Sequence, residues 1–290
     1  MTSGRARSAA ILLAWCAVCS AQTDKQPPAL PQGVTVEANV AYGQHPQTVL
    51  DIFVPTAKVG QKRCGVLAIH GGGWVNGTKE AVVRRIVLPW LTHGCVVANV
   101  EYRLAAAAPA PAAVEDVLQA ASWFRRNAKR WNVDDDRLIA VGTSAGGHLA
   151  LMAGLTTKQA KLGPATKFAA VVNFYGITDV EDQLGGENAR KYALTWVPEG
   201  PERMELARRV SPISYVRKDV PAVLTIHGTA DTTVPYEHGV RITKALRDAG
   251  ADAEMISVPE GKHALTEEQY SQAWEQIFAF LERRRLLGQH

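Results

Sequence analysis

Short, almost continuously apolar runs that end in glycine constrain the fold of this chain more than any other feature. Three examples are "GVLAIHG" at 65–71, "LIAVG" at 138–142 and "AVLTIHG" at 222–228. Strands with one face in water alternate apolar and polar residues, whereas uninterrupted runs are typical of strands buried on both faces of a parallel sheet. A segment with helical character lies between each of these runs and the next. The pattern predicts an α/β protein whose mostly parallel sheet is covered by helices on both faces.

The same alternation extends along most of the chain. Before it come two alternating strands joined by the turn sequence "GQHP", which predict a hairpin at the start of the sheet. Glycines that follow the predicted helices, Gly94 and Gly250, are expected to end them. The predicted strands are 34–42, 47–55, 65–70, 95–102, 138–143, 168–176, 222–228 and 253–259. The predicted helices are 79–92, 112–131, 145–155, 236–249 and 266–287.

One segment interrupts the alternation. Residues 180–212 are polar, contain "GG" and "PEGP", and lie between two predicted strands. Insertions of this length are usually functional, so we interpret this one as a cap or lid. The chain has 290 residues, 47% of them hydrophobic, which suffices for one large core. We therefore expect a single domain over 34–287.

The first residues have the pattern of a secretory signal peptide. Arg5 and Arg7 precede an apolar run at 9–18, and small residues follow in "VCSAQ". The run is too short to span a bilayer. Trp15 and Val18 occupy positions where a lipoprotein would carry small residues before its lipidated cysteine. We expect removal of residues 1–21 and a secreted or periplasmic protein without a stable membrane insertion.

Charge and cysteine content give two further expectations. Loss of Arg5 and Arg7 lowers the formal net charge from +4 to +2, too little to indicate a nucleic-acid partner. Cys64 and Cys95 would remain, each directly before a strand-like run. In an exported protein they could form a disulfide, and two buried free thiols are the alternative.

The stretch "GTSAG" at 142–146 carries the first candidate catalytic residue, Ser144. A sharp turn from strand to helix would raise the serine hydroxyl above the carboxyl edge of the sheet, and the small neighbours would prevent clashes across the turn. The helix that begins at Ala145 would direct free N–H groups toward negative charge formed there. This context predicts a nucleophilic serine.

The stretch "HGGGW" at 70–74 ends the earlier buried strand. Three glycines allow the backbone to approach a ligand closely, so the N–H groups of Gly72 and Gly73, with that of Ala145, could hold an oxyanion. A plain glycine-rich loop and a phosphate cradle are the alternatives. The run lacks the G-K-[ST] ending and the spacing of a P-loop.

A nucleophilic serine needs a base and a group that orients the base. Asp231, in "HGTADTTVP", and His263, in "PEGKHALT", both follow predicted strands. They would therefore lie at the same carboxyl edge as Ser144. The chain order serine, acid, histidine is the one found on the α/β-hydrolase sheet, and it differs from the orders in chymotrypsin and subtilisin.

The sequence resembles the α/β-hydrolase superfamily over about residues 34–287. The motifs "HGGGW", "VEYRL", "GTSAGGHLA" and "HGTADTTVP…GKH" are most similar to hormone-sensitive-lipase-like esterases and to bacterial feruloyl and acetyl-xylan esterases. The resemblance implies Ser144 as nucleophile, His263 as general base and acid, Asp231 as its orienting group, and an oxyanion hole made by Gly72, Gly73 and Ala145. It also implies an eight-stranded sheet. Thr143 stands where many lipase-like relatives carry aspartate, which weakens that subgroup but not the triad.

Other polar and aromatic residues receive less specific interpretations. Trp74 and Trp196 are candidates for the substrate pocket, with core packing as the alternative. Asp179 is a candidate second acid or lid anchor. We expect structural roles for the remaining candidates: a packed histidine (His148), a loop-fixing histidine (His70), a strand-end histidine (His227), an ion pair (Arg103 and Asp116) and a solvated acidic turn (134–136).

These observations predict a secreted serine esterase that acts through an acyl-enzyme on small acyl, acetyl or feruloyl esters, including those of plant polysaccharide. An amide hydrolase with the same triad, such as a formamidase or a peptidase-like enzyme, is the first alternative. A non-catalytic binding protein on the same fold is the second. No zinc-type or calcium-type ligand spacing and no nucleotide fingerprint occur in the sequence, so we expect neither a metal nor a cofactor.

Overall fold

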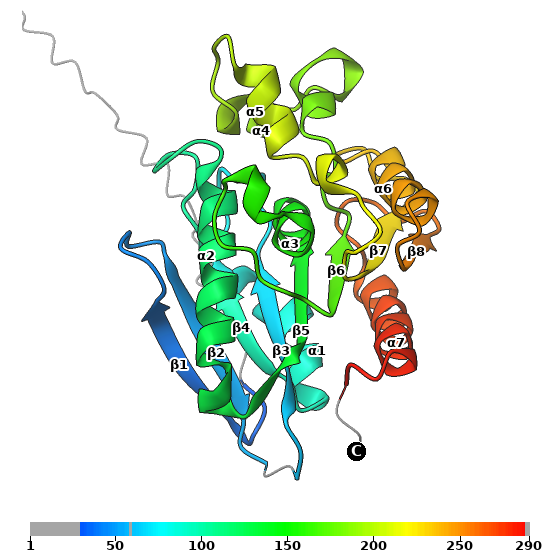
Figure 1. The fold of residues 1–290 in the computed structure, drawn as a ribbon. Helices are drawn as coiled ribbons and strands as arrows, with labels where there is room; N and C mark the ends of the chain where they lie inside the picture. The colour runs from blue at the N-terminus through cyan, green and yellow to red at the C-terminus, as the bar shows by residue number, and fades with distance from the viewer. Residues whose placement is uncertain (1–29, 58–59, 288–290) are drawn as a thin grey trace, which may run out of the picture.

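The computed structural model describes residues 30–57 and 60–287 (Figure 1). The predicted signal peptide at 1–21 lies outside the described residues. One sheet of eight strands forms the centre, in the order β1-β2-β4-β3-β5-β6-β7-β8. The strands are β1 (Val34–Ala41), β2 (Val49–Pro55), β3 (Arg63–Ile69), β4 (Val96–Val100), β5 (Val133–Thr143), β6 (Ala170–Phe174), β7 (Ala222–Gly228) and β8 (Ala253–Val258).

The sheet is mixed but mostly parallel. The hairpin β1–β2 is antiparallel, and β2 also pairs antiparallel with β4. All remaining pairs, from β4 through β3 and β5 to β8, are parallel. Every residue of β3, β4 and β6 is buried. The prediction of a mostly parallel sheet that begins with a hairpin is therefore confirmed.

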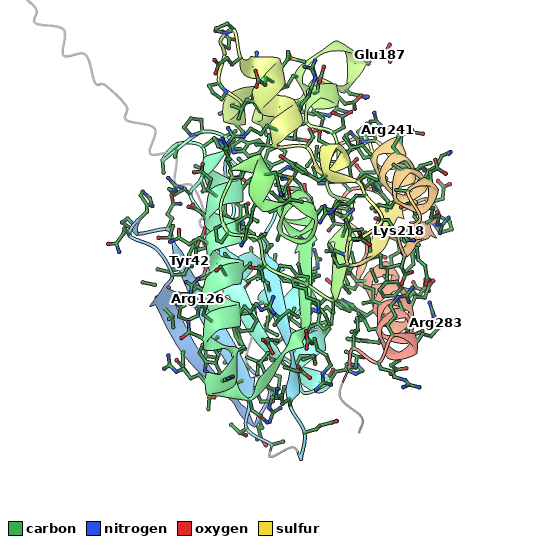
Figure 2. All side chains as sticks on the ribbon, viewed as in Figure 1. Tyr42, Arg126, Glu187, Lys218, Arg241 and Arg283 are labelled. Carbon is green, nitrogen blue, oxygen red and sulfur yellow. A yellow bond between two sulfur atoms is a disulfide. The ribbon has the colours of Figure 1, made fainter. Side chains whose placement is uncertain are left out.

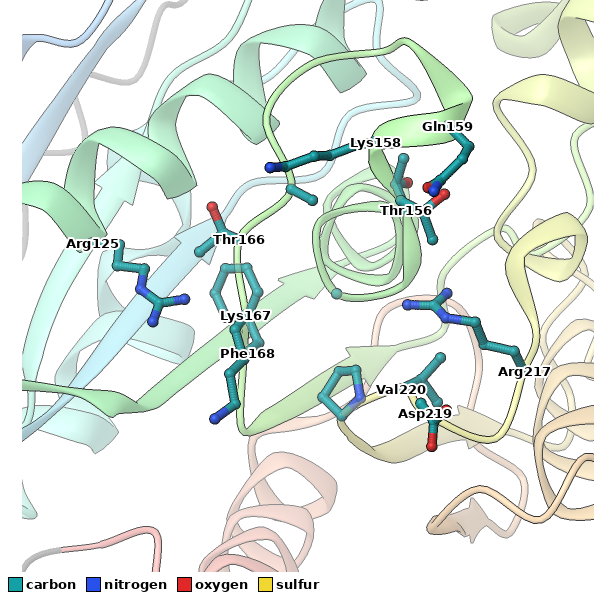
Figure 3. Close-up of a pocket in the computed structure, with 14 residues that line it drawn as sticks. Arg125, Thr156, Lys158, Gln159, Thr166, Lys167, Phe168, Arg217, Asp219 and Val220 are labelled. Carbon is teal, nitrogen blue, oxygen red and sulfur yellow. The ribbon is translucent and has the colours of Figure 1, made fainter.

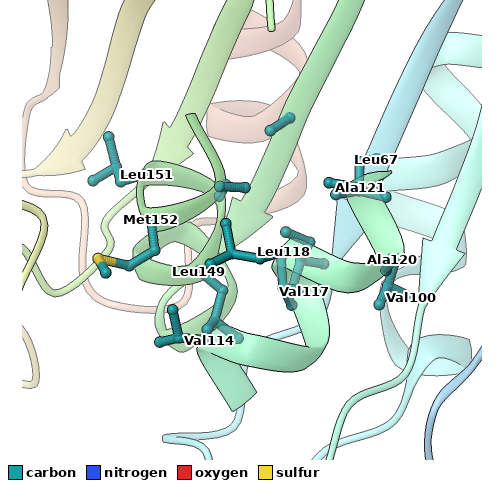
Figure 4. Packing of buried hydrophobic residues seen from close by; sticks show 14 of the residues in the cluster. Leu67, Val100, Val114, Val117, Leu118, Ala120, Ala121, Leu149, Leu151 and Met152 are labelled. Carbon is teal, nitrogen blue, oxygen red and sulfur yellow. The ribbon is translucent and has the colours of Figure 1, made fainter. Parts of the chain in front are cut away.

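Helices cover both faces of the sheet (Figure 1). The helices are α1 (Leu88–Thr92), α2 (Ala112–Asn127), α3 (Ala145–Leu155), α4 (Lys191–Trp196), α5 (Arg203–Arg209), α6 (Glu237–Asp248) and α7 (Glu267–Arg283). Helices α2, α3 and α6 contribute to one hydrophobic cluster, and α1 and α7 to the cluster on the opposite face. Figure 4 shows the first cluster, to which Val117, Leu118 and Ala121 of α2, Leu149 of α3 and Leu67 of β3 all contribute. None of the helices in the described ranges has the length and hydropathy that a membrane span requires.

The predicted helix over 79–92 is divided into three short pieces. A 3₁₀ turn, η1 (Lys79–Val82), is followed by a π-type turn, η2 (Val83–Val87), and then by α1. Pro89 has no N–H to donate to the carbonyl of Arg85, four residues before it. The indole Nε1 of Trp274 donates to that carbonyl instead, at 3.0 Å. The segment ends at Gly94, which has φ +71°, as predicted.

The acidic residues 134–136 do not form a turn before the fifth strand. They lie within β5, which begins at Val133, five residues earlier than predicted. Val133 pairs with Arg63 of β3, and a register irregularity separates this pair from the regular ladder that starts at Leu138. The prediction of a solvated turn is wrong because backbone pairing to β3 continues past the apolar run. Cys64 of β3 and Cys95 before β4 are joined by a disulfide, with their Cα atoms 4.7 Å apart.

Candidate active site

Ser144 lies at a sharp turn between β5 and α3. Its backbone has φ 55° and ψ −121°, a conformation that a non-glycine residue rarely adopts. The glycines around it allow the elements to approach closely: a Cβ on Gly146 would lie 2.2 Å from the carbonyl oxygen of Ile69 in β3, and one on Gly142 would lie 2.2 Å from that of Gly146. The turn requires glycine at both positions and holds the serine at its apex.

Ser144, His263 and Asp231 form one hydrogen-bonded chain. The Nε2 atom of His263 lies 2.9 Å from Oγ of Ser144, and its Nδ1 atom lies 2.8 Å from Oδ2 of Asp231. The three residues follow β5, β8 and β7, and because these strands are parallel members of one sheet, their carboxyl ends lie at the same edge. The structure thus brings together the three residues singled out in the sequence.

The Asp231 carboxylate is held ionised in a buried position. Its Oδ1 atom accepts hydrogen bonds from the N–H groups of Thr233 and Val234, at 2.8 and 3.0 Å. Burial raises the pKa of Asp231, but contacts with His227 and His263 and the Val234 N–H outweigh burial, so the pKa lies well below the usual range. An ionised Asp231 favours the proton on Nδ1 of His263. That leaves Nε2 free to accept the serine proton.

The loop after β3 supplies backbone N–H groups beside Ser144. Gly72 and Gly73 have φ values of +120° and +58°. Neither N–H donates to any group in the described ranges. Ala145 is the first residue of α3, so its N–H has no partner within the helix. These are the donors expected of an oxyanion hole.

His70 fixes this loop from beneath. Its Nδ1 atom lies 2.7 Å from the carbonyl oxygen of Gly71, and its Nε2 atom lies 3.0 Å from Oε1 of Glu101. The ring stacks on Tyr102, with centroids 4.3 Å apart. The structure therefore gives His70 the loop-fixing role that the sequence predicted, and Glu101 and Tyr102 support it.

Sequence reasoning missed Tyr175. This residue follows β6 with φ 41°, and its ring centroid lies 4.9 Å from that of His263. Its hydroxyl contacts the hydroxyl of Tyr270 on α7. A signal existed in the sequence, because Tyr175 follows a buried strand at the same edge as the catalytic candidates. Without the structure, however, it could not be distinguished from a core aromatic residue.

A cavity of about 290 Å³ begins at the glycine loop. Gly71 lines it, and a Cβ on Gly71 would lie 3.3 Å from Cβ of Ser144. The far wall carries Tyr175, Tyr270 and Arg85, and Arg85 lies over the Tyr270 ring and pairs with Glu267 at 2.8 Å. Ala81, Val82 and Ile86 add apolar lining, and Thr143, the residue before Ser144, also lines the cavity.

Trp74 and Trp196 do not line this cavity. Both are fully buried and stack on each other with ring centroids 4.0 Å apart. The prediction that they form a substrate pocket is wrong, because neither ring has surface left for a ligand. Their contact instead fixes the insertion, which carries Trp196 on α4, to the loop that carries Trp74.

The insertion between β6 and β7 carries α4 and α5 (Figure 1) and contacts both the glycine loop and the loop with Asp231. Tyr192 of α4 packs on Gly73, where an added Cβ would lie 2.7 Å from Cβ of Tyr192. Arg190 donates to the carbonyls of Thr232 and Thr233, beside Asp231, at 2.8 and 2.9 Å. The insertion therefore contacts the glycine loop on one side and the acid loop on the other.

The base of the insertion is tied to α6. Nε2 of His238 lies 3.0 Å from Oδ2 of Asp182. Arg241, labelled in Figure 2, lies 3.4 Å from carboxylate oxygens of Asp182 and Asp179. Asp179 thus anchors the base of the insertion and is not part of the hydrogen-bonded chain at Ser144.

His148, on α3 four residues after Ser144, is fully buried, and its ring has two hydrogen-bond partners. Its Nδ1 atom accepts from Nε1 of Trp74 at 3.2 Å, and Nε2 lies 2.6 Å from the carbonyl oxygen of Val210. Burial lowers the pKa of His148 to about 4, despite the opposing hydrogen bond to Val210. It is a packed neutral histidine.

Two further expectations can be compared with the structure. His227 lies at the end of β7, with Nε2 2.9 Å from the carbonyl oxygen of Val234. Arg103 and Asp116 form a bidentate pair, with Nη2 2.7 Å from Oδ1, and Asp116 is buried. Both arrangements are structural, as the sequence predicted.

Within the described ranges, only the acidic residues 134–136 offer three ligand atoms close together, all within 4.8 Å of one another. Each carboxylate already has a cationic partner: Arg137 for Asp134, Arg125 for Asp135 and Lys167 for Asp136. None of these three acidic residues belongs to the hydrogen-bonded chain of Ser144, His263 and Asp231.

Comparison with known proteins identifies relatives that are named as esterases. "Esterase LipC" from Mycobacterium tuberculosis is 32% identical over 218 residues, covering 72% of this chain and 54% of its own length. "Esterase LipQ" from the same organism is 27% identical and is likewise covered over 54% of its length. This chain therefore spans about half the length of the curated relatives it matches.

Solved structures give the same result for the fold. A truncated carbohydrate esterase from gut microbiota superimposes with a TM-score of 0.76 at 26% identity, covering 88% of this chain and 99% of that chain. A bifunctional GH43-CE protein of Bacteroides eggerthii has a TM-score of 0.72 at 26% identity, with 84% of this chain and 38% of that chain covered. The fold is that of α/β-hydrolase esterases.

The family match extends over residues 50–246. This range contains the glycines at 71–73, the turn at Ser144 and Asp231, and it covers more than half of the chain. The chain therefore belongs to the BD-FAE family.

Proposed function

We propose that this protein is a carboxylic-ester hydrolase that acts through an acyl-enzyme. The observation that carries the proposal is the chain of hydrogen bonds from Ser144 through His263 to Asp231, next to the N–H groups of Gly72 and Gly73, which have no partner within residues 30–57 and 60–287. This combination provides an activated nucleophile, a base with a fixed tautomer and a place for an oxyanion.

The reaction follows from the positions of these groups. Nε2 of His263 accepts the Ser144 hydroxyl proton while Oγ attacks the ester carbonyl, and the N–H groups of Gly72, Gly73 and Ala145 stabilise the resulting oxyanion. Nε2 then returns the proton to the leaving alcohol as the C–O bond breaks. Water next attacks the acyl-enzyme with the same groups in the same roles, releasing the acid and restoring Ser144.

We further propose small acyl, acetyl or feruloyl esters, including those of plant polysaccharide, as substrates. Membership of the BD-FAE family and likeness to two proteins named as carbohydrate esterases support this class. The cavity of about 290 Å³ beside Gly71 provides room for an acyl group, with Tyr175 and Arg85 near its polar end. The insertion, which contacts Gly73 and the Asp231 loop, would act as a cap.

Export fits this function. The pattern of the first 21 residues supports secretion or transfer to the periplasm, where esterified polysaccharide fragments would be met. The Cys64–Cys95 disulfide fits the same compartment.

A fluorophosphonate provides a direct test of the nucleophile. We expect the intact mass of the protein without residues 1–21 to rise by one phosphonyl group, with the modified peptide containing Ser144. Ser144→Ala should not react. Parallel rates on matched esters and anilides would show whether ester hydrolysis dominates. Labelling at another residue, or faster anilide hydrolysis, would contradict the proposal.

A further inference from the structure

A second and larger cavity lies at the opposite edge of the sheet from Ser144. Its volume is about 540 Å³, within the range of small-molecule sites. Residues after α3, before β6 and before β7 line it, together with Arg125 of α2 (Figure 3). Ser144 lies beyond the carboxyl end of β6, whose five residues correspond to roughly 16 Å. A ligand here would not contact the catalytic groups.

Cationic side chains dominate the lining. Arg125, Lys158, Lys167 and Arg217 contribute four positive charges, and Asp219 contributes the single negative one. Figure 3 shows the guanidinium groups of Arg125 and Arg217 pointing toward each other from opposite sides of the cavity. Like charges that face each other across a cavity are stabilised by an anion between them.

Two of these cations have no carboxylate partner. The Nη1 atom of Arg217 donates to the carbonyls of Leu155 and Tyr215, at 2.5 and 3.1 Å, which holds the guanidinium in place. Arg217 and Lys158 form no ion pair with any acid in the described part of the chain, and the Lys158 ammonium group forms no hydrogen bond there either. By contrast, Lys167 pairs with Asp136 at 3.1 Å and Arg125 approaches Asp135 at 3.7 Å.

An unpartnered hydroxyl provides a second, independent indication of a ligand. Thr156 lines the cavity and is 5% exposed, and its Oγ1 atom has no hydrogen-bond partner among the described residues. A buried hydroxyl without a partner is costly, and such groups usually bind water or ligand. Thr156 follows the last residue of α3, beside the carbonyl of Leu155 that Arg217 contacts.

The mixture of groups indicates the class of ligand. Arg217 and Lys158 suit a carboxylate, whereas Thr156, Gln159 and Asp219 suit neutral hydroxyl groups. Asp219 would repel a compact dianion such as phosphate but can accept a hydrogen bond from a hydroxyl. Phe168, Val220 and Pro221 add apolar surface of the kind on which a sugar ring can pack.

We propose that this cavity binds an acidic sugar unit, a uronate, of the polysaccharide that carries the ester. This inference rests on the proposed function for its source of ligand. It implies a second contact with the polysaccharide, remote from the ester under attack, that increases the local concentration of substrate.

Calorimetric titration with oligogalacturonate tests the proposal, with a neutral xylo-oligosaccharide of equal length and inorganic phosphate as the comparison probes. We expect binding of the acidic oligosaccharide that weakens with added salt, and weaker or no binding of the other two. Lys158→Ala and Arg217→Gln should each weaken binding on the order of tenfold, the effect of losing one charged hydrogen-bond donor. Lys244→Ala, which removes an exposed charge on α6, should not.

Two controls keep the outcomes distinct. Because the Lys158 ammonium group has no ion pair or hydrogen bond in the described part of the chain, its substitution should leave the melting temperature and the hydrolysis of p-nitrophenyl acetate unchanged. Ser144→Ala should bind the acidic oligosaccharide normally. Hydrolysis that survives in Ser144→Ala would refute the proposed function alone. No binding of oligogalacturonate, equal binding of the neutral oligosaccharide or of phosphate, or unchanged binding by both cavity variants would overturn the uronate site.

Discussion

The Cys64–Cys95 disulfide makes a quantitative prediction about stability. The bond joins β3 to the residue before β4 and closes a loop of 31 residues. That loop contains the glycines of the proposed oxyanion hole and the segments η1, η2 and α1. The perturbation is the removal of this cross-link, either by reduction or by the double substitution Cys64→Ala/Cys95→Ala.

The magnitude follows from the loop length. In the chain-entropy treatment, closing a loop of 31 residues lowers the entropy of the unfolded chain enough to stabilise the native state by about 3–4 kcal/mol. For a domain of this size, the loss corresponds to a melting temperature lower by about 7–15 °C. The triad atoms lie outside the loop, so activity at 25 °C should change far less than stability.

The assay uses protein without residues 1–21, in which Cys64 and Cys95 are the only cysteines. Thiol titration in denaturant should find no free thiol before reduction and two after it. Urea unfolding of the oxidised, the reduced and the doubly substituted protein then gives the three stabilities, and the reduced protein separates the cross-link from the loss of buried sulfur. Equal stability of oxidised and reduced protein, or two free thiols before reduction, would refute the reasoning.

Three further predictions follow from the site. Folding lowers the pKa of His148 to about 4, below its unfolded value. The neutral histidine therefore contributes stability above about pH 6.5, and this contribution is lost as the pH falls toward 4. Between these pH values, the free energy of unfolding should fall less steeply in His148→Asn than in the unsubstituted protein. Gly72→Ala should lower kcat by two to three orders of magnitude, because the substitution would displace an N–H donor of the oxyanion hole. Gly72 has φ +120°, and a Cβ there would lie 1.9 Å from the carbonyl oxygen of Asn76. Near-normal ester turnover in that variant would argue against the proposed role of the loop. A chelator should leave ester hydrolysis unchanged, and activity that falls and returns with added metal would contradict the mechanism.

The sequence was sufficient to predict the parts of the site that depend on strand order. Ser144, Asp231 and His263 follow three parallel strands of one sheet, and parallel strands place their carboxyl ends at the same edge. The glycines at 142 and 146 were interpretable as a tight turn because a side chain at either position would overlap backbone atoms.

Other features depend on contacts between distant segments, which a single sequence does not contain. Trp74 and Trp196 stack on each other across 122 residues of chain, so their burial was not visible from composition. Tyr175 could not be separated from core aromatics. The break in the predicted helix over 79–92 depends partly on Trp274, whose indole N–H donates to the carbonyl of Arg85 in place of the N–H that Pro89 lacks. The continuation of β5 through 134–136 depends on pairing with β3.

The most direct test of the proposed activity is the initial rate of the protein without residues 1–21 on p-nitrophenyl esters with two to sixteen acyl carbons. Ser144→Ala is the matched control, and it should lower turnover by on the order of 10⁶-fold. The proposal predicts the highest rate at two to four carbons and its loss in the variant. No Ser144-dependent rate at any chain length would contradict the central claim that Ser144 is the nucleophile of an ester hydrolase.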